Sequence, residues 1–334
     1  MISPDAARTH WQHLECVHAV VYFSPEVIEA MMGLGLRGFW SGYFAGRAAP
    51  LGPVGPAVVE ALFYNFSPDL VRRALPAAWQ VVTPDLVSST RLHSVDAALW
   101  SILGEQVRTP ELVAVAQLAR RAAEAADCSG RALAAAHAAQ QWPTVAHLVL
   151  WQAATVLREH RGDGHVSVLV NEGISGVAAH LLAAASGQSD ADQLREARFW
   201  SQAHWDDAAE DLRSRGLLDE AGKLTKRGRA LKVRIEAQTD RLAAGPYQAL
   251  NDDEQQRLLS CGARLAQLVV RSEVLPFPNP MGLARPERVP EPGDGDVIDL
   301  TAKDALPARG ASPKRRPNRT SNGAASEPRA PRRR

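Results

Sequence analysis

The segment that most constrains the fold of this chain covers residues 205–243, with the sequence WDDAAEDLRSRGLLDEAGKLTKRGRALKVRIEAQTDRLA. Its first part carries apolar residues at helical spacing and reaches Gly216, a residue type that commonly ends helices. Gly222 follows inside LLDEAGKL, where a tight turn between two strands needs a glycine. Thr225 can cap a second long helix, on which apolar residues again recur at helical spacing. The segment therefore predicts a helix, a short β-hairpin and a second helix.

This order of elements is the outline of a winged helix, and the segment resembles the C-terminal half of the MarR-type winged-helix domain. The resemblance implies a fold. Because one fold hosts many activities, the function has to be argued from individual sites.

Length and composition place this segment in a larger, all-α protein. The chain has 334 residues, enough for two domains, and its alanine-rich stretches favour helices. We expect two helical halves, with a boundary at Trp142-Pro143. Residues 1–142 would form an N-terminal helical domain, and residues 143–284 a winged-helix domain with a small β-hairpin wing, a C-terminal helix and a proline-rich strap. Residues 285–334 would form a disordered basic tail.

The charge of the chain is unevenly distributed. The formal net charge is +1, yet residues 307–334 hold nine basic residues and one acidic residue, which leaves the remainder at −7. The folded part therefore repels a polyanion on average, and only the tail could contact nucleic acid, weakly.

Targeting and redox signals are absent from the sequence. No apolar run approaches the roughly 18 residues of a membrane span, and the N-terminal MISPDAARTHWQHLE lacks the apolar core of a signal peptide. We therefore expect a cytoplasmic protein without membrane contact. Cys16, Cys128 and Cys261 show no paired spacing, which argues against structural disulfides and a cysteine zinc site.

Four longer segments carry a second resemblance. They are HAVVYFSPE (18–26), GLRGFWSGYFAGRAAPLGPVGPAVVEALFYNFSPDLV (35–71), LREHRGDGHVSVLV (157–170) and PFPNPMGL (276–283). Together with the winged-helix segment they resemble the actinobacterial SalK-type helix-turn-helix family over about residues 8–284. The resemblance implies an all-helical N-terminal half and a winged-helix C-terminal half. It supplies no catalytic residue and no cofactor.

The helix expected at residues 204–215 would enter the DNA groove in a MarR-type protein. It carries four carboxylates against Arg213 and Arg215, and carboxylates facing phosphates oppose binding. Three interpretations stay open: a scaffold that only packs, sequence-specific DNA binding, and a weak contact assisted by the tail. The four carboxylates belong to Asp206, Asp207, Glu210 and Asp211.

The motif REHRGDGH, residues 158–165, concentrates polar groups in an otherwise apolar region. Gly162 is expected to end one helix and Asp163 to cap the next. His160, Asp163 and His165 could contact an organic ligand, or could serve only a helix corner. A metal site with His160, His165 and a neighbouring carboxylate is a third alternative, but HxxxxH is not an established metal-ligand spacing and we assign no metal ligand here.

The N-terminal half offers a second group of candidate ligand-binding residues. His18 and Tyr22 share a helix face, and Tyr43, Arg47, Tyr64 and Asn65 lie near glycine-rich turns. Gly38, Gly42 and Gly46 share one helix face, which lets a backbone or a flat ligand approach. Arg47 has no acidic neighbour in sequence, which suits an anionic or planar aromatic ligand. A buried aromatic core is the alternative.

From these sites we predict a small-molecule-binding, winged-helix-like protein that acts as a ligand-responsive regulator linked to secondary metabolism. The partner is a small molecule, and a homodimer is compatible with the sequence. The rival hypothesis is a metal- or haem-assisted enzyme that uses His18, His160 or His165. The sequence leaves enzymatic activity open and identifies no cofactor. The predicted ligand-binding residues are His18, Tyr22, Tyr43, Arg47, Tyr64, Asn65, His160, Asp163 and His165.

Overall fold

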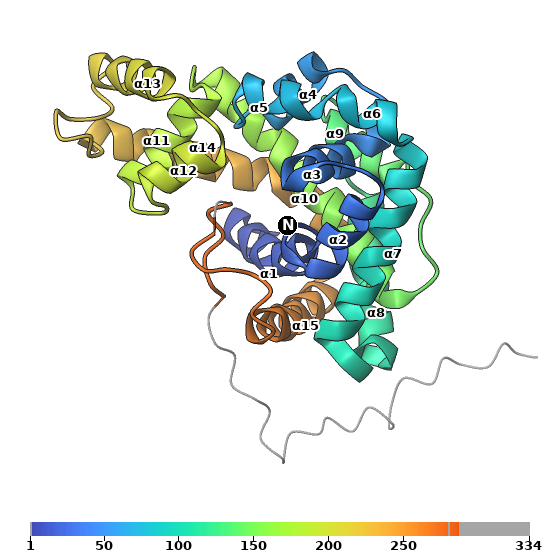
Figure 1. Cartoon of the computed structure of the whole chain (residues 1–334). Helices are drawn as coiled ribbons and strands as arrows, with labels where there is room; N and C mark the ends of the chain where they lie inside the picture. The colour runs from blue at the N-terminus through green and yellow to red at the C-terminus, as the bar shows by residue number, and fades with distance from the viewer. Residues whose placement is uncertain (1, 280, 287–334) are drawn as a thin grey trace, which may run out of the picture. The chain divides into compact units, whose positions relative to one another are not determined.

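The computed structural model describes residues 2–279 and 281–286 (Figure 1). All regular elements of this described part are helices. The tail predicted at residues 285–334 lies almost entirely outside it. The first nine α-helices are α1 (Pro4–Phe23), α2 (Pro25–Gly33), α3 (Gly38–Ala48), α4 (Pro56–Phe63), α5 (Pro68–Ala74), α6 (Ala77–Val81), α7 (Pro84–Leu103), α8 (Pro110–Glu124) and α9 (Ala132–Ala138). They are followed by α10 (Ala146–Asn171), α11 (Gly176–Ala185), α12 (Ala191–Ala197), α13 (Gln202–Ser214), α14 (Lys226–Ala244) and α15 (Asp252–Arg271). Short 3-10 helices are η1 (Ala49–Leu51), η2 (Gly104–Arg108) and η3 (Gly245–Ala249).

Helix α10 is the central element, with 26 residues that are mostly buried against α1, α8, α9 and α14 (Figure 1). The predicted break at Gly162 and the predicted cap at Asp163 are therefore wrong, because α10 continues through both residues. Each glycine costs a helix about 1 kcal/mol relative to alanine, and packing on several sides outweighs this cost. Gly164 has a packing reason: a Cβ there would lie 2.5 Å from Nη1 of Arg131.

Two clusters of buried apolar residues divide the interior. The first contains residues of helices α1 through α9, of the first half of α10, and of the chain after α14, including α15. The second joins the end of α10 to α11, α12, α13 and the first part of α14. The division between the clusters runs through α10, between Leu157 and Val168. The domain boundaries at residues 142 and 284 stay predictions.

The β-hairpin wing is not formed as predicted. The described residues contain no strand, and a single antiparallel bridge joins Leu218 to Leu224. Between them the side chain of Asp219 stabilises a tight turn. Its Oδ1 accepts hydrogen bonds from the backbone N–H groups of Ala221 and Lys223 at 3.0 and 2.9 Å. Gly222 has a φ of +73°, as a tight turn requires. Because α14 begins two residues after Leu224, the chain has no room to extend the bridge into strands.

No single helix of the described chain is long and apolar enough to cross a membrane. Only α10 and α11 together pass a test of length and composition, and they are bent by 95° relative to each other.

Candidate functional site

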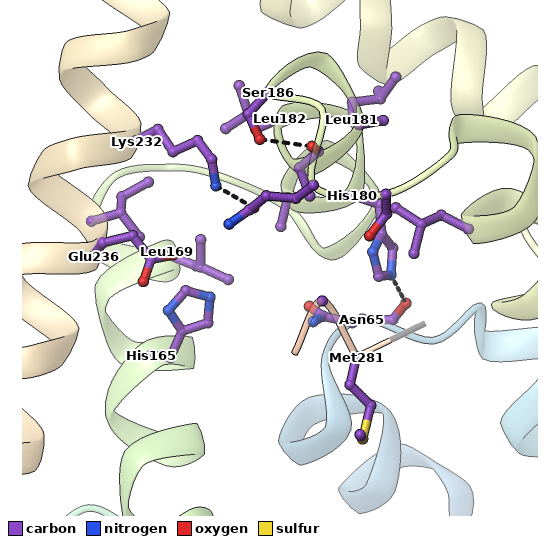
Figure 2. Close-up of a pocket in the computed structure, with 18 of the residues that line it drawn as sticks. Asn65, His165, Leu169, His180, Leu181, Leu182, Ser186, Lys232, Glu236 and Met281 are labelled. Atoms are coloured by element: carbon purple, nitrogen blue, oxygen red, sulfur yellow. Dashed lines mark hydrogen bonds between the residues drawn. The ribbon is translucent and has the colours of Figure 1, made fainter. Parts of the chain in front are cut away.

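A cleft of about 1950 Å³ lies where the two apolar clusters meet. It is lined by α1, α3 and the residues around the end of α4, and by α11, α12, α13 and α14, of which α14 also contacts α1. Helix α10 forms the floor, and Met281 with the three residues after it closes one edge. Figure 2 shows part of this cleft, with His165 of α10, Lys232 of α14 and His180 of α11 on different sides of it.

The floor of the cleft is one face of α10. Arg158, Arg161, Gly162, His165 and Leu169 line the cleft, and their spacing of three and four residues places them on a single helical stripe. The other residues of the REHRGDGH motif point away from it. The motif therefore divides its polar groups between a ligand-accessible face and the protein interior.

Glu159 faces the interior and is held between two arginines. Its two carboxylate oxygens accept Nε and Nη2 of Arg47 at 2.9 and 2.8 Å, and Oε1 also accepts Nη1 of Arg158 at 2.8 Å. Burial alone would raise the pKa of this carboxyl, but Arg158 and Arg47 outweigh it and hold that pKa well below its usual value. The prediction that Arg47 is unpaired is wrong, because its partner lies 112 residues later in the chain.

Of the nine predicted ligand-binding residues, the structure places five on the cleft and four elsewhere. On the cleft lie Tyr22, Tyr43, Arg47, Asn65 and His165. Away from it lie His18, Tyr64, His160 and Asp163. Whether the five bind a ligand stays a prediction.

His18 acts from behind the cleft wall. Its Nδ1 is 3.0 Å from Oγ1 of Thr155 and its Nε2 is 3.0 Å from the hydroxyl of Tyr22, which faces the cleft. Burial, followed by the charge of Arg158, lowers the pKa of His18 well below its usual value, so the ring is neutral. His18 therefore orients Tyr22.

His160 and Asp163 are packed against neighbouring helices. Burial lowers the pKa of His160 to about 4, with a further contribution from Arg131. The carboxylate of Asp163 accepts the backbone N–H of Ala134 at 3.0 Å, near the start of α9. Burial raises the pKa of Asp163 to about 6. Both residues stabilise the contact between α10 and the α9 region.

The loop after α4 connects the two sides of the cleft. Tyr64 has a φ of +51° and donates its hydroxyl to the carbonyl of Ile174 at 2.7 Å. The carbonyl of Asn65 accepts Nε2 of His180 at 2.9 Å, which Figure 2 shows, and Nε1 of Trp200 at 3.2 Å. The side-chain Oδ1 of Asn65 is buried without a hydrogen-bond partner. One residue on the cleft therefore anchors both α11 and the chain just before α13.

Aromatic rings crowd one end of the cleft. Tyr43 lies 5.1 Å from Tyr22 and 5.4 Å from Phe66, measured between ring centroids. The guanidinium groups of Arg47 and Arg198 lie 4.1 Å and 4.5 Å above the rings of Phe63 and Phe66. Tyr22 and Tyr43 at this end were among the predicted residues, whereas Arg158 and Arg198 were missed. The three- and four-residue spacing from Arg158 to His165 was the signal that could have found Arg158.

The glycine face of α3 packs against other helices. A Cβ at Gly42 would lie 3.0 Å from Cβ of Met31 in α2, and one at Gly46 would lie 3.6 Å from Cδ of Arg91 in α7. The close approach predicted for this face therefore serves helix packing.

At the other end of the cleft, polar side chains from α1, α10 and α14 bind one another. Arg161 donates Nη1 to Oδ1 of Asp240 at 2.7 Å, and Arg8 donates Nε to Oδ2 of the same carboxylate at 2.8 Å. Nδ1 of His165 is 2.9 Å from Oγ1 of Thr239. Lys232 donates to Oε1 of Gln188 at 2.6 Å across the edge of the cleft.

The three histidines of the enzyme hypothesis have different surroundings. His18 contacts Thr155 and Tyr22, His165 contacts Thr239, and His160 is buried beside Arg131. No group of three or more potential metal-ligating side chains forms in the part of the chain that the structure describes. The arrangement therefore gives these histidines no common site.

The chain was compared with protein families, curated proteins and solved structures to identify its relatives. The model of a family described as the Helix-turn-helix family matches residues 7–276. The chain belongs to this family. No curated protein and no solved structure matches the chain. Membership of the helix-turn-helix family suggests a DNA-binding regulator.

In this helix-turn-helix protein, α12 and α13 are consecutive helices separated by four residues, 198–201, with Phe199 at a φ of +63°. Trp205, Ala209 and Leu212 bury one side of α13 in the second apolar cluster. The opposite side is exposed and acidic, and its two arginines are paired within the helix or just after it. Arg213 contacts Glu210 at 3.1 Å and Arg215 contacts Asp211 at 3.2 Å. The exposed carboxylates are those of Asp206, Asp207, Glu210 and Asp211.

Proposed function

We propose that this protein is a ligand-responsive helix-turn-helix regulator, in which α12 and α13 form the helix-turn-helix and the cleft holds a small molecule. The observation that carries the proposal is that α11 to α14 line the cleft together with N-terminal helices. A molecule in the cleft would contact the helix-turn-helix and the N-terminal helices at once. It would favour one spacing of these elements and so shift the population of helix-turn-helix positions.

Asn65 offers a route for this coupling. Its side chain lines the cleft, and its carbonyl binds His180 of α11 and Trp200 before α13. Tyr64 beside it has an unusual positive φ, a kind of backbone strain that is often found at functional and switching sites. A ligand that contacts Asn65 would therefore act directly on the anchor of the helix-turn-helix.

The resemblance to SalK-type and MarR-like proteins and the link to secondary metabolism remain part of this proposal. The acidic face of α13 disfavours deep insertion of this helix into a DNA groove. Exposed basic residues follow it, Lys223 in the turn and Lys226 and Arg227 at the start of α14. We propose weak, salt-sensitive contacts of these residues and of the tail with DNA phosphates.

Filling the cleft tests the ligand-responsive function. A Cβ at Gly162 would have Oε2 of Glu159 at 3.8 Å as its nearest neighbour, so Gly162→Met can extend into the cleft without breaking α10. We expect Gly162→Met to change the affinity of the full chain for its own upstream DNA by about 5-fold or more, the low end of usual allosteric coupling. Fluorescence anisotropy at low salt measures this affinity.

The matched control is Gly162→Ala, which adds one methyl group and leaves most of the cleft open. We expect it to bind DNA like the native chain. Equal DNA affinity of Gly162→Met and the native chain would contradict the proposal, and so would the absence of DNA binding at about 50 mM salt, where phosphate contacts are strong.

Charge reversal on α13 tests the proposed mode of DNA contact. Replacing Asp207 and Glu210 by lysine removes two carboxylates from the exposed face and adds two cations. We expect DNA affinity to rise by about 10-fold or more at low salt, with a steeper salt dependence, because new phosphate contacts release counterions. The corresponding change at Asp252 and Asp253, in the first turn of α15, is the control for net charge. If both double variants gained affinity equally, α13 would not face the DNA.

A further inference from the structure

The aromatic end of the cleft holds more positive than negative charge among the residues that the structure describes. Three arginines line the cleft there, Arg47, Arg158 and Arg198, and Arg91 lies buried behind them. The pKa of Arg91 is lowered by burial and, among its neighbours, by Arg158 and Arg47. The two carboxylates at this end belong to Glu15 and Glu159.

These two carboxylates are already engaged. Glu159 accepts three hydrogen bonds from Arg47 and Arg158. Glu15 accepts Nε1 of Trp11 at 3.2 Å and lies 3.6 Å from Nε of Arg158. Burial raises the pKa of Glu15 above its usual value, despite the opposite effect of Arg158. Four arginines therefore face two carboxylates at this end. The cluster therefore keeps an excess of positive charge.

Nη2 of Arg91, whose residue is 5% exposed, and Oδ1 of Asn65 are buried at this end without a hydrogen-bond partner. An unsatisfied buried polar group costs about 1–3 kcal/mol, and more if it is charged. The guanidinium of Arg91 is 4.8 Å above the ring of Trp151, which stabilises the cation without adding a counter-charge. Negative charge brought into the cleft would relieve part of this cost.

The surroundings also restrict the body of such a ligand. Tyr22, Trp40, Tyr43, Phe63 and Phe66 all line this end of the cleft. Rings and guanidinium planes favour flat, apolar groups that stack on them. Oδ1 of Asn65 adds an acceptor for an N–H or O–H group.

We propose that this end of the cleft binds a planar aromatic anion, with its negative group at Arg158 and Arg198, its rings among the aromatic side chains, and an N–H or O–H donor at Asn65. The proposal rests on the proposed function because it names the ligand class of the same cleft. Arg158 is suited to the contact because its side chain is 18% exposed and only Nε and Nη1 take part in its contacts with Glu15 and Glu159.

A matched pair of fluorescent probes tests the ligand class on the full chain. The first is 8-anilinonaphthalene-1-sulfonate and the second is N-phenyl-1-naphthylamine, which has the same rings and N–H group without the sulfonate. We expect the native protein to bind the sulfonate probe at least 10-fold more tightly. Inorganic salt should weaken the sulfonate probe alone, because screening acts on charge.

Variants assign the binding to the proposed residues. Arg158→Gln and Arg198→Gln should each weaken the sulfonate probe by 5-fold or more and leave the neutral probe within 2-fold, whereas Arg158→Lys should retain part of the preference. Asn65→Ala should weaken both probes, since both carry the N–H donor. Arg121→Gln, on the surface beside Glu254, is the control that should change neither. Retained affinity for the neutral probe shows that a variant is still folded.

Equal affinity of the native chain for the two probes would overturn the proposal, as would a preference for the sulfonate that survives in both glutamine variants. Failure of the proposed function is a separate result. If the sulfonate probe bound as expected but Gly162→Met left DNA binding unchanged, the ligand class would stand and the regulatory function would fail.

Discussion

Replacing Glu159 by glutamine is expected to lower the free energy of unfolding by about 3–5 kcal/mol, the cost of removing one partner from a buried ion pair. Glu159 is fully buried and accepts hydrogen bonds from Arg47 and Arg158. Glutamine keeps the size of the side chain but leaves Arg47 without its counter-charge and Arg158 with Glu15 alone. Urea unfolding at pH 7, followed by circular dichroism, measures the loss.

The pH dependence of the same difference provides a second readout. The folded-state pKa of Glu159 lies well below the ordinary value of 4.5, so its stabilisation is present above about pH 4.5 and is lost as the pH falls through the folded pKa. The native chain and Glu159→Gln should therefore approach each other in stability toward acid. Glu254→Gln, which removes an exposed partner of Arg121, should leave stability almost unchanged. A Glu159 variant as stable as this control would refute the ion-pair network.

Gly176→Ala is the second change with a large expected effect. A Cβ at this first residue of α11 would lie 2.1 Å from the carbonyl oxygen of Tyr64 and 3.2 Å from Cα of Asn65. Backbone cannot yield as a flexible side chain does, so we expect a loss of about 3 kcal/mol, at the upper end of the cost of overpacking. Thermal unfolding measures the loss, and hydrogen exchange should show faster opening of α11 and of residues 198–205.

Gly33→Ala is the matched control for this change. Gly33 is the exposed last residue of α2, it has no positive φ and no atom lies within 4 Å of a Cβ, so alanine should be neutral or slightly stabilising there. If Gly176→Ala behaved in the same way, the close contact between α11 and the loop at Tyr64 would not exist in solution.

Local signals in the sequence predicted the helical class correctly but misjudged two features, the helix end at Gly162 and the β-hairpin. Gly162 looked like the end of a helix because, in a single sequence, a glycine reads the same whether it ends a helix or lies inside one. The packing of α10 on four sides decides the matter, and it involves residues far away in the chain. The hairpin failed for a local reason, because the side chain of Asp219 tightens the turn and α14 starts two residues after Leu224.

Prediction of the candidate site depended on how far apart its partners lie in sequence. Tyr22, Tyr43 and Asn65 were predicted from local patterns of aromatic and turn residues, and all three line the cleft. Arg47 was misread, since its partner Glu159 belongs to a different helix. Arg158 and Arg198, the residues of the proposed anion site, are 40 residues apart in sequence and line one cleft only in the folded chain.

The packing of α1 has a consequence for how the protein folds during its synthesis on the ribosome. Helix α1 contacts α14 and α15, and Arg8 binds Asp240, 232 residues later. Helix α1 therefore cannot complete these contacts until nearly all of the described chain has emerged from the ribosome, and its apolar side chains stay exposed until then. Such delayed closure favours capture by chaperones and makes truncated translation products prone to aggregation.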